Sequence, residues 1–407
     1  MIQVVLKWFR IAYNKVITSI AFLPAIIAIF FLLLSFGMIA FDFSSAGKNI
    51  KASLHWLSLK DASTARSICS AIAGGIISLA VFSFSMVMIL LNQAASQMSN
   101  RILGRLIGNR FQQVVLGFYI GTIVYALFLL STIRDINSGI YVPAISTYLL
   151  IALTVADIFL FIYFLHYITE SVKYETIIHR IYTYTKKEMK KSCILNTEPA
   201  ASPGEINGRK INAHASGLYQ GFDKDSLLES CKKEGAIISF IHPVGTYLME
   251  GIPLLTVTNK EEVSKDFEKK LSLVINIDKG QEISTSYYYG LKQLMEIAIK
   301  ALSPGINDPG TAVISLHAIG DLLAYKLQHF AEVYLKDEEG FIRIITKEKT
   351  FEEIFTEFIS PVWDYGKNDR SVQREMLHIL MQLKMKGEQP VINALLQQLH
   401  SAIIENN

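Results

Sequence analysis

One acidic residue interrupts a long apolar segment in the first half of the chain. Asp157 lies within residues 142–168, where no other Asp, Glu, Lys or Arg occurs. Burying an unpaired carboxylate at the centre of a bilayer costs about 2.5 to 3.5 kcal/mol. The side chain is therefore expected to be protonated, hydrogen-bonded to a Ser or Thr, or in contact with water. An ion or proton pathway and a structural, hydrogen-bonded carboxyl group are both compatible with this position.

A second apolar segment, residues 67–92, is more polar than the others. Three of its polar residues recur at intervals of seven, which places them on one face of a helix. If several copies of this helix surround an axis, that face lines a pore. The pattern favours a simpler alternative, in which small residues let helix backbones approach closely, and the two are compatible. This polar stripe consists of Gly74, Gly75, Ser78, Ser85 and Asn92.

A short segment near residue 305 has the composition of a joint between two helices. The first helix must end before a proline, Gly305 can adopt a positive φ, and Asp308 can cap the second helix with Pro309 at its first position. A functional alternative uses Asn307 and Asp308 as an ion or partner site. The joint consists of Ser303, Pro304, Gly305, Asn307, Asp308 and Pro309.

Basic residues follow the last apolar segment and are interleaved with tyrosines. They predict a helix that leaves the membrane, and they can bind anionic lipid headgroups at about 1 kcal/mol per basic residue. Ordinary anchoring of the membrane topology explains most of this pattern as well. The basic residues are Lys173, Arg180, Lys186, Lys187, Lys190 and Lys191.

The elements that position these residues are apolar helices. Four segments of about 20 residues or more are apolar enough to cross the hydrocarbon core of a bilayer. Together they predict a transmembrane domain of residues 1–170. The expected helices lie near residues 16–41, 67–92, 113–133 and 142–168.

The distribution of Lys and Arg predicts the orientation of these helices. The N-terminal segment holds Lys7, Arg10 and Lys15 without an acidic residue, and the loop after the second helix holds three arginines without an acidic residue. Because short cytoplasmic loops are enriched in basic residues, both termini are expected in the cytoplasm. The loop between the first and second helices also carries basic residues although it is assigned to the outside. The other segments outweigh this one exception.

The second half of the chain has the mixed composition of a soluble fold. A basic juxtamembrane helix and a linker are expected over residues 171–210, a small β-rich module resembling a half-barrel over 211–280, and a helical region over 281–407. The predicted fold class is therefore a membrane protein with a four-helix transmembrane domain followed by an α+β cytoplasmic domain.

Composition excludes several classes of function. Residues 1–191 hold 17 Lys and Arg against 7 Asp and Glu, which leaves 22 against 29 for the remainder. An acidic soluble half gives no support for nucleic-acid binding. The chain has three widely spaced cysteines and no motif typical of phosphate-binding loops, zinc proteases, serine hydrolases or kinases. No enzymatic activity, cofactor or metal site is therefore expected.

Four segments carry a resemblance to a known family. They are residues 94–101, 112–125 and 163–166, and above all the run Ala-Leu-Ser-Pro-Gly-Ile-Asn-Asp-Pro at 301–309. This pattern resembles an uncharacterised family of bacterial membrane proteins, domain of unknown function 2254, over nearly the whole chain. The resemblance implies a location in the bacterial inner membrane and no particular activity.

Two classes of function remain. The favoured hypothesis is a homo-oligomeric channel-like or transport protein, in which the helix of the polar stripe and Asp157 line the path and the cytoplasmic domain regulates it. The alternative is a non-conducting scaffold or sensor that recruits a partner through its cytoplasmic domain. Both imply contact with a lipid bilayer, and the first requires several subunits, because four helices enclose little space.

Overall fold

The computed structural model describes Ser19 and residues 21–53, 61–97, 110–136, 139–199, 207–258, 264–278, 280 and 283–405. The chain forms two compact units that divide after Lys173. We call them the membrane unit and the C-terminal unit. The basic residues at 7–15 and 101–105 that predict the orientation, and the expected start of the first helix at 16–18, lie outside the described residues.

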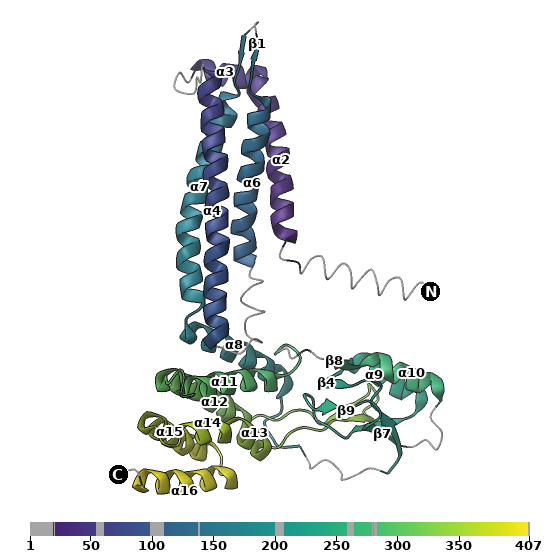
Figure 1. Cartoon of the computed structure of the whole chain (residues 1–407). Coiled ribbons are helices and arrows are strands. Elements are labelled where there is room, and N and C mark those ends of the chain that lie inside the picture. The colour runs from purple at the N-terminus through teal and green to yellow at the C-terminus, as the bar shows by residue number, and fades with distance from the viewer. Residues whose placement is uncertain are drawn as a thin grey trace. The chain divides into compact units, whose positions relative to one another are not determined.

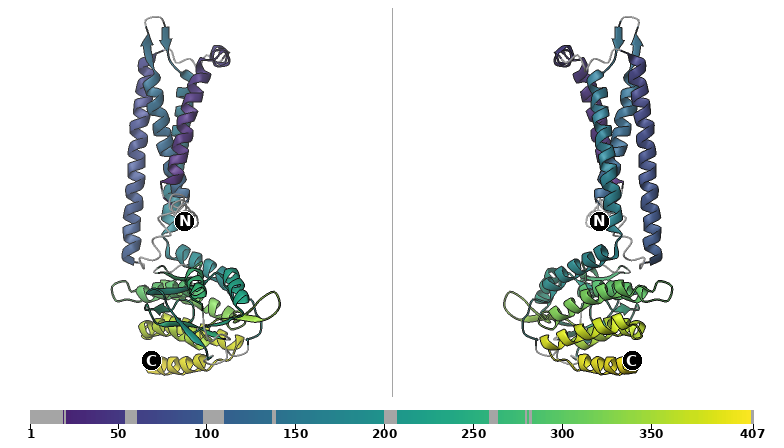
Figure 2. Two further views of the ribbon diagram at one scale, coloured as in Figure 1. Left: turned by 90° about the vertical axis from the view of Figure 1, so that its right-hand side faces the viewer. Right: turned by 90° about the vertical axis from the view of Figure 1, so that its left-hand side faces the viewer.

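Four long helices form the membrane unit and run side by side (Figures 1 and 2). They are α2 (Phe22–Phe43), α4 (Ala62–Gln97), α6 (Arg110–Thr132) and α7 (Ala144–Ser171). Each is long and apolar enough to cross a membrane, which confirms the four predicted transmembrane segments. The short helix α3 (Ser45–Ser53) follows α2, and a hairpin of β1 (Arg134–Ile136) and β2 (Gly139–Tyr141) joins α6 to α7.

Helices α2 and α6 pack closely because α6 carries two glycines four residues apart. A Cβ added to Gly117 would lie 2.6 Å from Ile27 Cδ1, and one added to Gly121 would lie 2.7 Å from Phe31 Cγ. Small residues at this spacing let two helix backbones approach in a membrane, where dispersion contacts drive association. The close helix packing in this unit therefore depends on α6 and not on the glycines of the polar stripe.

A buried ion pair fixes one end of the bundle. Asp42, at the end of α2, is fully buried and pairs with Lys51 Nζ of α3 at 2.8 Å. Its other carboxylate oxygen accepts hydrogen bonds from the backbone N (2.8 Å) and Oγ (3.0 Å) of Ser146 in α7. Since a buried charge is tolerated only when it is paired and hydrogen-bonded, this network holds three helices in register.

Two small sheets and nine helices make up the described part of the C-terminal unit. The strands are β3 (Arg209–Asn212), β4 (Gly217–Phe222), β5 (Ile237–Phe240), β6 (Tyr247–Leu248), β7 (Pro253–Thr258), β8 (Ile275–Asp278), β9 (Tyr334–Lys336) and β10 (Ile342–Ile345). The helices are α8 (Tyr174–Ser192), α9 (Lys224–Glu234), α10 (Lys265–Val274), α11 (Tyr287–Ala301), α12 (Pro309–Lys326), α13 (Phe351–Phe358), α14 (Ser360–Gly366), α15 (Arg370–Lys386) and α16 (Pro390–Glu405). This unit confirms the α+β class.

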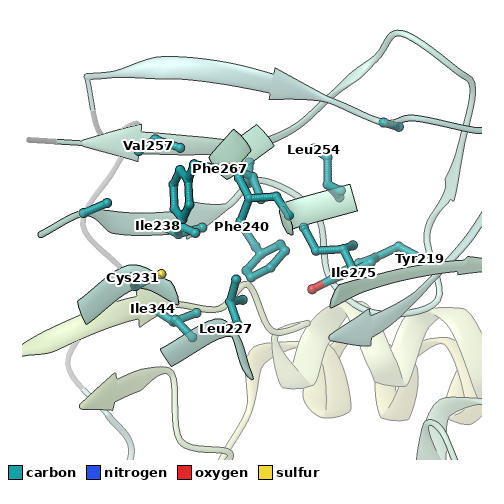
Figure 3. Packing of buried hydrophobic residues seen from close by; sticks show 14 of the residues in the cluster. Tyr219, Leu227, Cys231, Ile238, Phe240, Leu254, Val257, Phe267, Ile275 and Ile344 are labelled. Carbon is teal, nitrogen blue, oxygen red and sulfur yellow. The ribbon is translucent and has the colours of Figure 1, made fainter. Parts of the chain in front are cut away.

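The larger sheet has the order β3-β7-β5-β10-β9, and the smaller one has the order β6-β4-β8. Strand β10 runs parallel to β5, and the other pairs are antiparallel. Because β9 and β10 lie within residues 281–407, the larger sheet is not complete within residues 211–280. Leu227 of α9 and Phe267 of α10 belong to the buried hydrophobic cluster that includes residues of both sheets (Figure 3). In this cluster the Phe240 ring stacks on the Tyr219 ring, with 5.3 Å between the ring centroids.

The basic helix α8 belongs to the C-terminal unit. The expected continuous extension of the last transmembrane helix is wrong, because α7 ends at Ser171 and a new helix begins at Tyr174. Helix α8 packs its buried stripe on α11 and α12. A Cβ at Gly290 of α11 would overlap the side chain of Thr185, so the close crossing of α8 and α11 requires a glycine.

A partly buried polar network stabilises the start of α11. Tyr288 Oη donates a hydrogen bond to Glu348 Oε2 at 2.9 Å. The buried Lys326 lies over the Tyr287 ring, 5.8 Å from its centroid, with Nζ 3.5 Å from Cys193 Sγ. Burial raises the pKa of the Glu348 carboxyl group, and the positive charge of Lys326 only partly opposes this effect.

The α2–α6 contact predicts the effect of a glycine substitution. Gly117→Val places methyl groups against Ile27 and the backbone of Pro24, so we expect the free energy of unfolding to fall by about 1–3 kcal/mol. The measurement is unfolding of the purified protein by titration with sodium dodecyl sulfate. Gly37→Val in α2 is the matched control, because an added Cβ there meets no described atom within 4 Å. Equal losses in both variants would contradict the proposed role of Gly117.

The Glu348 network predicts a pH dependence. The pKa of Glu348 is raised in the folded state, so the folded protein binds this proton at a higher pH than the unfolded protein does. The free energy of unfolding therefore rises as the pH falls through the raised pKa. Glu348→Gln removes this contribution. We therefore expect the stability of the variant relative to wild type to be greatest at neutral pH and to decline as the pH falls towards 4.5, the ordinary pKa of a glutamate carboxyl group.

Unfolding midpoints at a series of pH values test this expectation, and the exposed Glu338→Gln serves as the control for removal of a carboxylate. A relative stability that is constant with pH, or that increases as the pH falls, would show that Glu348 does not titrate as the network implies.

Candidate functional site

Asp157 lies in the middle of α7 and is fully buried. The hydroxyl group of Thr122 in α6 lies beside the Asp157 carboxyl group. Neither carboxyl oxygen of Asp157 nor Oγ1 of Thr122 has a hydrogen-bond partner among the described residues. Thr154, one turn away on α7, instead donates to the carbonyl of Leu150 at 2.8 Å. The carboxyl group is thus placed among helices without a permanent partner.

Two further hydroxyl groups extend this arrangement. Tyr119 lies one turn before Thr122 on α6 and is fully buried, and Ser83 of α4 is 4% exposed beside it. Tyr119 Oη and Ser83 Oγ also lack hydrogen-bond partners in the described chain. We call Ser83, Tyr119, Thr122 and Asp157 the intramembrane cluster. It draws oxygen-bearing side chains from three of the four spanning helices.

The chemistry of the intramembrane cluster favours a small cation. All of its polar atoms are oxygens, which are the ligands that hard cations prefer. A single carboxylate balances one positive charge, whether a proton on the carboxyl group or a monovalent ion beside it. Within the described residues, no group of three or more His, Cys, Asp or Glu side chains could hold a metal ion. The cluster therefore suits a proton or a monovalent cation.

A cavity of about 190 Å³ borders two members of the intramembrane cluster. Helices α4, α6 and α7 all contribute to its walls, which are mostly apolar. Two members of the cluster, Ser83 and Tyr119, line it directly. Its other lining residues are Ala80, Phe84, Val87, Met88, Gln112, Gln113, Val115, Leu116 and Phe164.

The polar stripe lies on the outer surface of α4. All five of its residues, Gly74, Gly75, Ser78, Ser85 and Asn92, are exposed in the single chain. Added Cβ atoms at the two glycines would meet nothing within 4 Å, and Ser78 Oγ donates to the carbonyl of Gly74 at 3.0 Å. The chain's own helices do not use this stripe for packing.

The helix joint is closed by local hydrogen bonds. Asp308 caps α12 by accepting from the backbone N of Thr311 at 3.1 Å, and Pro309 is the first residue of that helix, which confirms the predicted cap. The positive φ predicted for Gly305 is wrong, because Asn307 adopts it (49°). An amide side chain tolerates this conformation better than most residues do. The capping bonds occupy the Asp308 carboxylate, while Asn307, Pro304 and Gly305 remain exposed.

Half of the basic residues after α7 form ion pairs. Lys173 pairs with Glu170, Lys186 with Asp321 and Lys191 with Glu188, all on partly or largely exposed side chains. The other three, Arg180, Lys187 and Lys190, have no ion-pair partner in the described part of the chain. These three remain available for anionic groups.

The C-terminal unit contains a pocket of about 400 Å³ that sequence reasoning missed. Its walls come from β4, β6, α11, α13 and the segments beside them. Tyr289 is 4% exposed, and its hydroxyl group has no hydrogen-bond partner among the described residues. The lining residues are Gly217, Leu218, Val244, Gly245, Tyr247, Tyr288, Tyr289, Lys292, Lys349, Glu357 and Phe358.

Sequence reasoning found Asp157 but not its neighbours. Tyr119 and Thr122 are three residues apart, so they share a helix face, and this spacing was the available signal. Ser83 stands outside the repeat of seven that defines the polar stripe, and it faces the opposite side of α4. Which helix supplies the neighbours of Asp157 depends on tertiary packing, and no local pattern encodes that.

Comparisons with known proteins agree with the membrane fold. The model of a family described as predicted membrane protein (DUF2254) matches residues 17–382. The chain is 26% identical over 245 residues to the uncharacterized proteins Mb1321c of Mycobacterium bovis and MT1328 and Rv1290c of Mycobacterium tuberculosis. Each match covers 58% of this chain and 47% of the relative, so the chain spans about half the length of these curated relatives. No solved structure matches the chain. Since the family model covers most of the sequence, the chain belongs to the DUF2254 family of predicted membrane proteins.

Proposed function

We propose that this protein is a homo-oligomeric, channel-like transport protein for protons or a small monovalent cation. The intramembrane cluster is the site that the cation occupies during its passage. The cavity of about 190 Å³ supplies the approach to this site from one side of the bundle.

The observation that supports transport is the state of Asp157. A carboxyl group in a transmembrane helix is costly, and three neighbouring hydroxyl groups are also buried without partners. A purely structural carboxyl group would accept hydrogen bonds, as Asp42 does from Ser146. Four unpartnered oxygen groups from three helices are the arrangement expected of a site that binds and releases a cation.

The outer face of α4 supports an oligomer. The polar stripe is exposed, and the space beside Gly74 and Gly75 is open. A small-residue face of this kind lets a helix of a second copy approach closely. Copies that meet through α4 would cover the stripe, and the Ser85 and Asn92 side chains would then face a neighbouring subunit or a shared axis.

The remaining expectations belong to the same proposal. The protein resides in the bacterial inner membrane with both termini in the cytoplasm, so the C-terminal unit is a cytoplasmic regulatory domain. Arg180, Lys187 and Lys190 contact anionic lipid headgroups. The protein has no catalytic activity and does not bind nucleic acid. The exposed tip of the helix joint, including Asn307, is available to a cytoplasmic partner.

Ion flux through proteoliposomes tests this function. The purified full-length protein is reconstituted, its oligomeric mass is determined, and uptake of H⁺, Na⁺ and K⁺ is measured separately. We expect wild type to conduct at least one of them. Asp157→Asn keeps the shape of the side chain but removes its charge, so flux should fall to near the level of protein-free liposomes.

Two further variants make the flux experiment specific. Thr154→Val is the control on the same helix, because its hydroxyl group bonds within α7, and it should conduct like wild type. Ser85→Leu should weaken the oligomer, because the larger leucine side chain on the outer face of α4 prevents the close approach of a second copy. If a well-folded oligomer passes none of the three cations, transport is excluded and the chain is a scaffold or sensor.

A further inference from the structure

The pocket of about 400 Å³ in the C-terminal unit has the size of a small-molecule site. It lies where the smaller sheet meets the helices, with β4 and β6 on one side and α11 and α13 on the other. Gly245 has a φ of +94°, and a Cβ at that position would lie 3.8 Å from Tyr289 Oη. The turn after β5 thus brings backbone close to the tyrosine hydroxyl without closing the pocket.

The charges around the pocket favour an anion. Lys349 pairs with Glu357, and its Nζ also lies 5.2 Å from the centroid of the Tyr288 ring. Lys292 is half-buried and has no ion-pair or hydrogen-bond partner among the described residues. After the lysine–glutamate pair cancels, Lys292 is the remaining charged residue of the lining, and its positive charge attracts an anionic ligand.

The pocket also offers flat surfaces and an unused polar atom. Tyr247 is 60% exposed, while Phe358 and Tyr288 are buried in the wall. Aromatic faces of this kind stack on planar rings. The Tyr289 hydroxyl group lies beside the Gln220 side chain, and Tyr289 Oη makes no normal hydrogen bond among the described residues. A buried polar atom without a partner costs about 1–3 kcal/mol, so it favours a ligand that hydrogen-bonds to it.

We propose that this pocket binds a nucleoside phosphate. Lys292 pairs with the phosphate, Tyr247 stacks on the base, and the Tyr289 hydroxyl group hydrogen-bonds to a polar atom of the ligand. A nucleoside phosphate uses the Lys292 charge, the exposed Tyr247 ring and the volume of about 400 Å³ together. An inorganic anion would leave the aromatic ring unused, and a neutral metabolite would leave the lysine charge unused. This proposal does not depend on cation transport, because nucleotide binding is measured without ion flux.

Calorimetric titration of the full-length protein in detergent tests the proposal. The ligands are ATP, ADP, AMP, GTP, adenosine and inorganic phosphate, each measured separately. We expect at least one nucleotide to bind, and adenosine and inorganic phosphate to bind more weakly by roughly tenfold or more. Failure of all four nucleotides to bind, or binding of inorganic phosphate as tightly as any nucleotide, would overturn it.

Pocket variants place the binding at this site. Lys292→Ala should weaken nucleotide affinity by roughly tenfold or more, and Lys292→Arg should restore most of it. Tyr289→Phe keeps the ring and removes the hydroxyl group, so a smaller loss is expected. Lys269→Ala removes an exposed lysine of α10 that does not line the pocket, and it is the matched charge control. Equal losses in Lys269→Ala and Lys292→Ala would show nonspecific attraction and overturn the proposal. Unfolding midpoints verify that each variant is folded.

Discussion

A carboxyl group inside a membrane bundle needs compensation, and this requirement governs the proposed mechanism. Asp157 lies beside Thr122 of α6, and neither side chain completes a normal hydrogen bond among the described residues. The cost of such a group is about 2.5 to 3.5 kcal/mol on insertion scales. In the proposed function, a proton or a monovalent cation supplies the missing charge and leaves again, since no arginine or lysine pairs with Asp157 in the described membrane unit. A site of this kind has the reversibility that transport requires.

The rest of the membrane unit divides into a rigid side and an accessible side. Gly117 and Gly121 bring α2 and α6 together, and Asp42 ties α2 to α7 through Ser146. These contacts hold α6 and α7 in place. Helix α6 carries two members of the intramembrane cluster, and α7 carries one. Helix α4 is different, since one face borders the cavity while Gly74 and Gly75 on its outer stripe have no described residue within 4 Å of an added Cβ. It is therefore the helix most suited to contact a second copy.

Strong local signals were enough to predict the elements, whereas contacts between elements were not predictable. Length and hydropathy predicted all four spanning helices, and the cap at Asp308 followed from its position directly before Pro309. The boundary after α7 was missed, because amphipathic α8 packs on α11 through Gly290, a contact between residues far apart in the sequence. Asp157 was identifiable from composition alone. Its partners and the C-terminal pocket were not, because side chains from several elements assemble there only on folding.

The most direct measurement of the state of Asp157 is an infrared difference spectrum between wild type and Asp157→Asn, recorded across a pH series with and without Na⁺. We predict a carbonyl stretch of a protonated carboxylic acid that is absent from the variant and that disappears as the pH rises. If Na⁺ occupies the same site, the band should disappear at a lower pH in its presence. A carboxyl group whose signal does not respond to pH or to Na⁺ would contradict a reversible cation site at the intramembrane cluster.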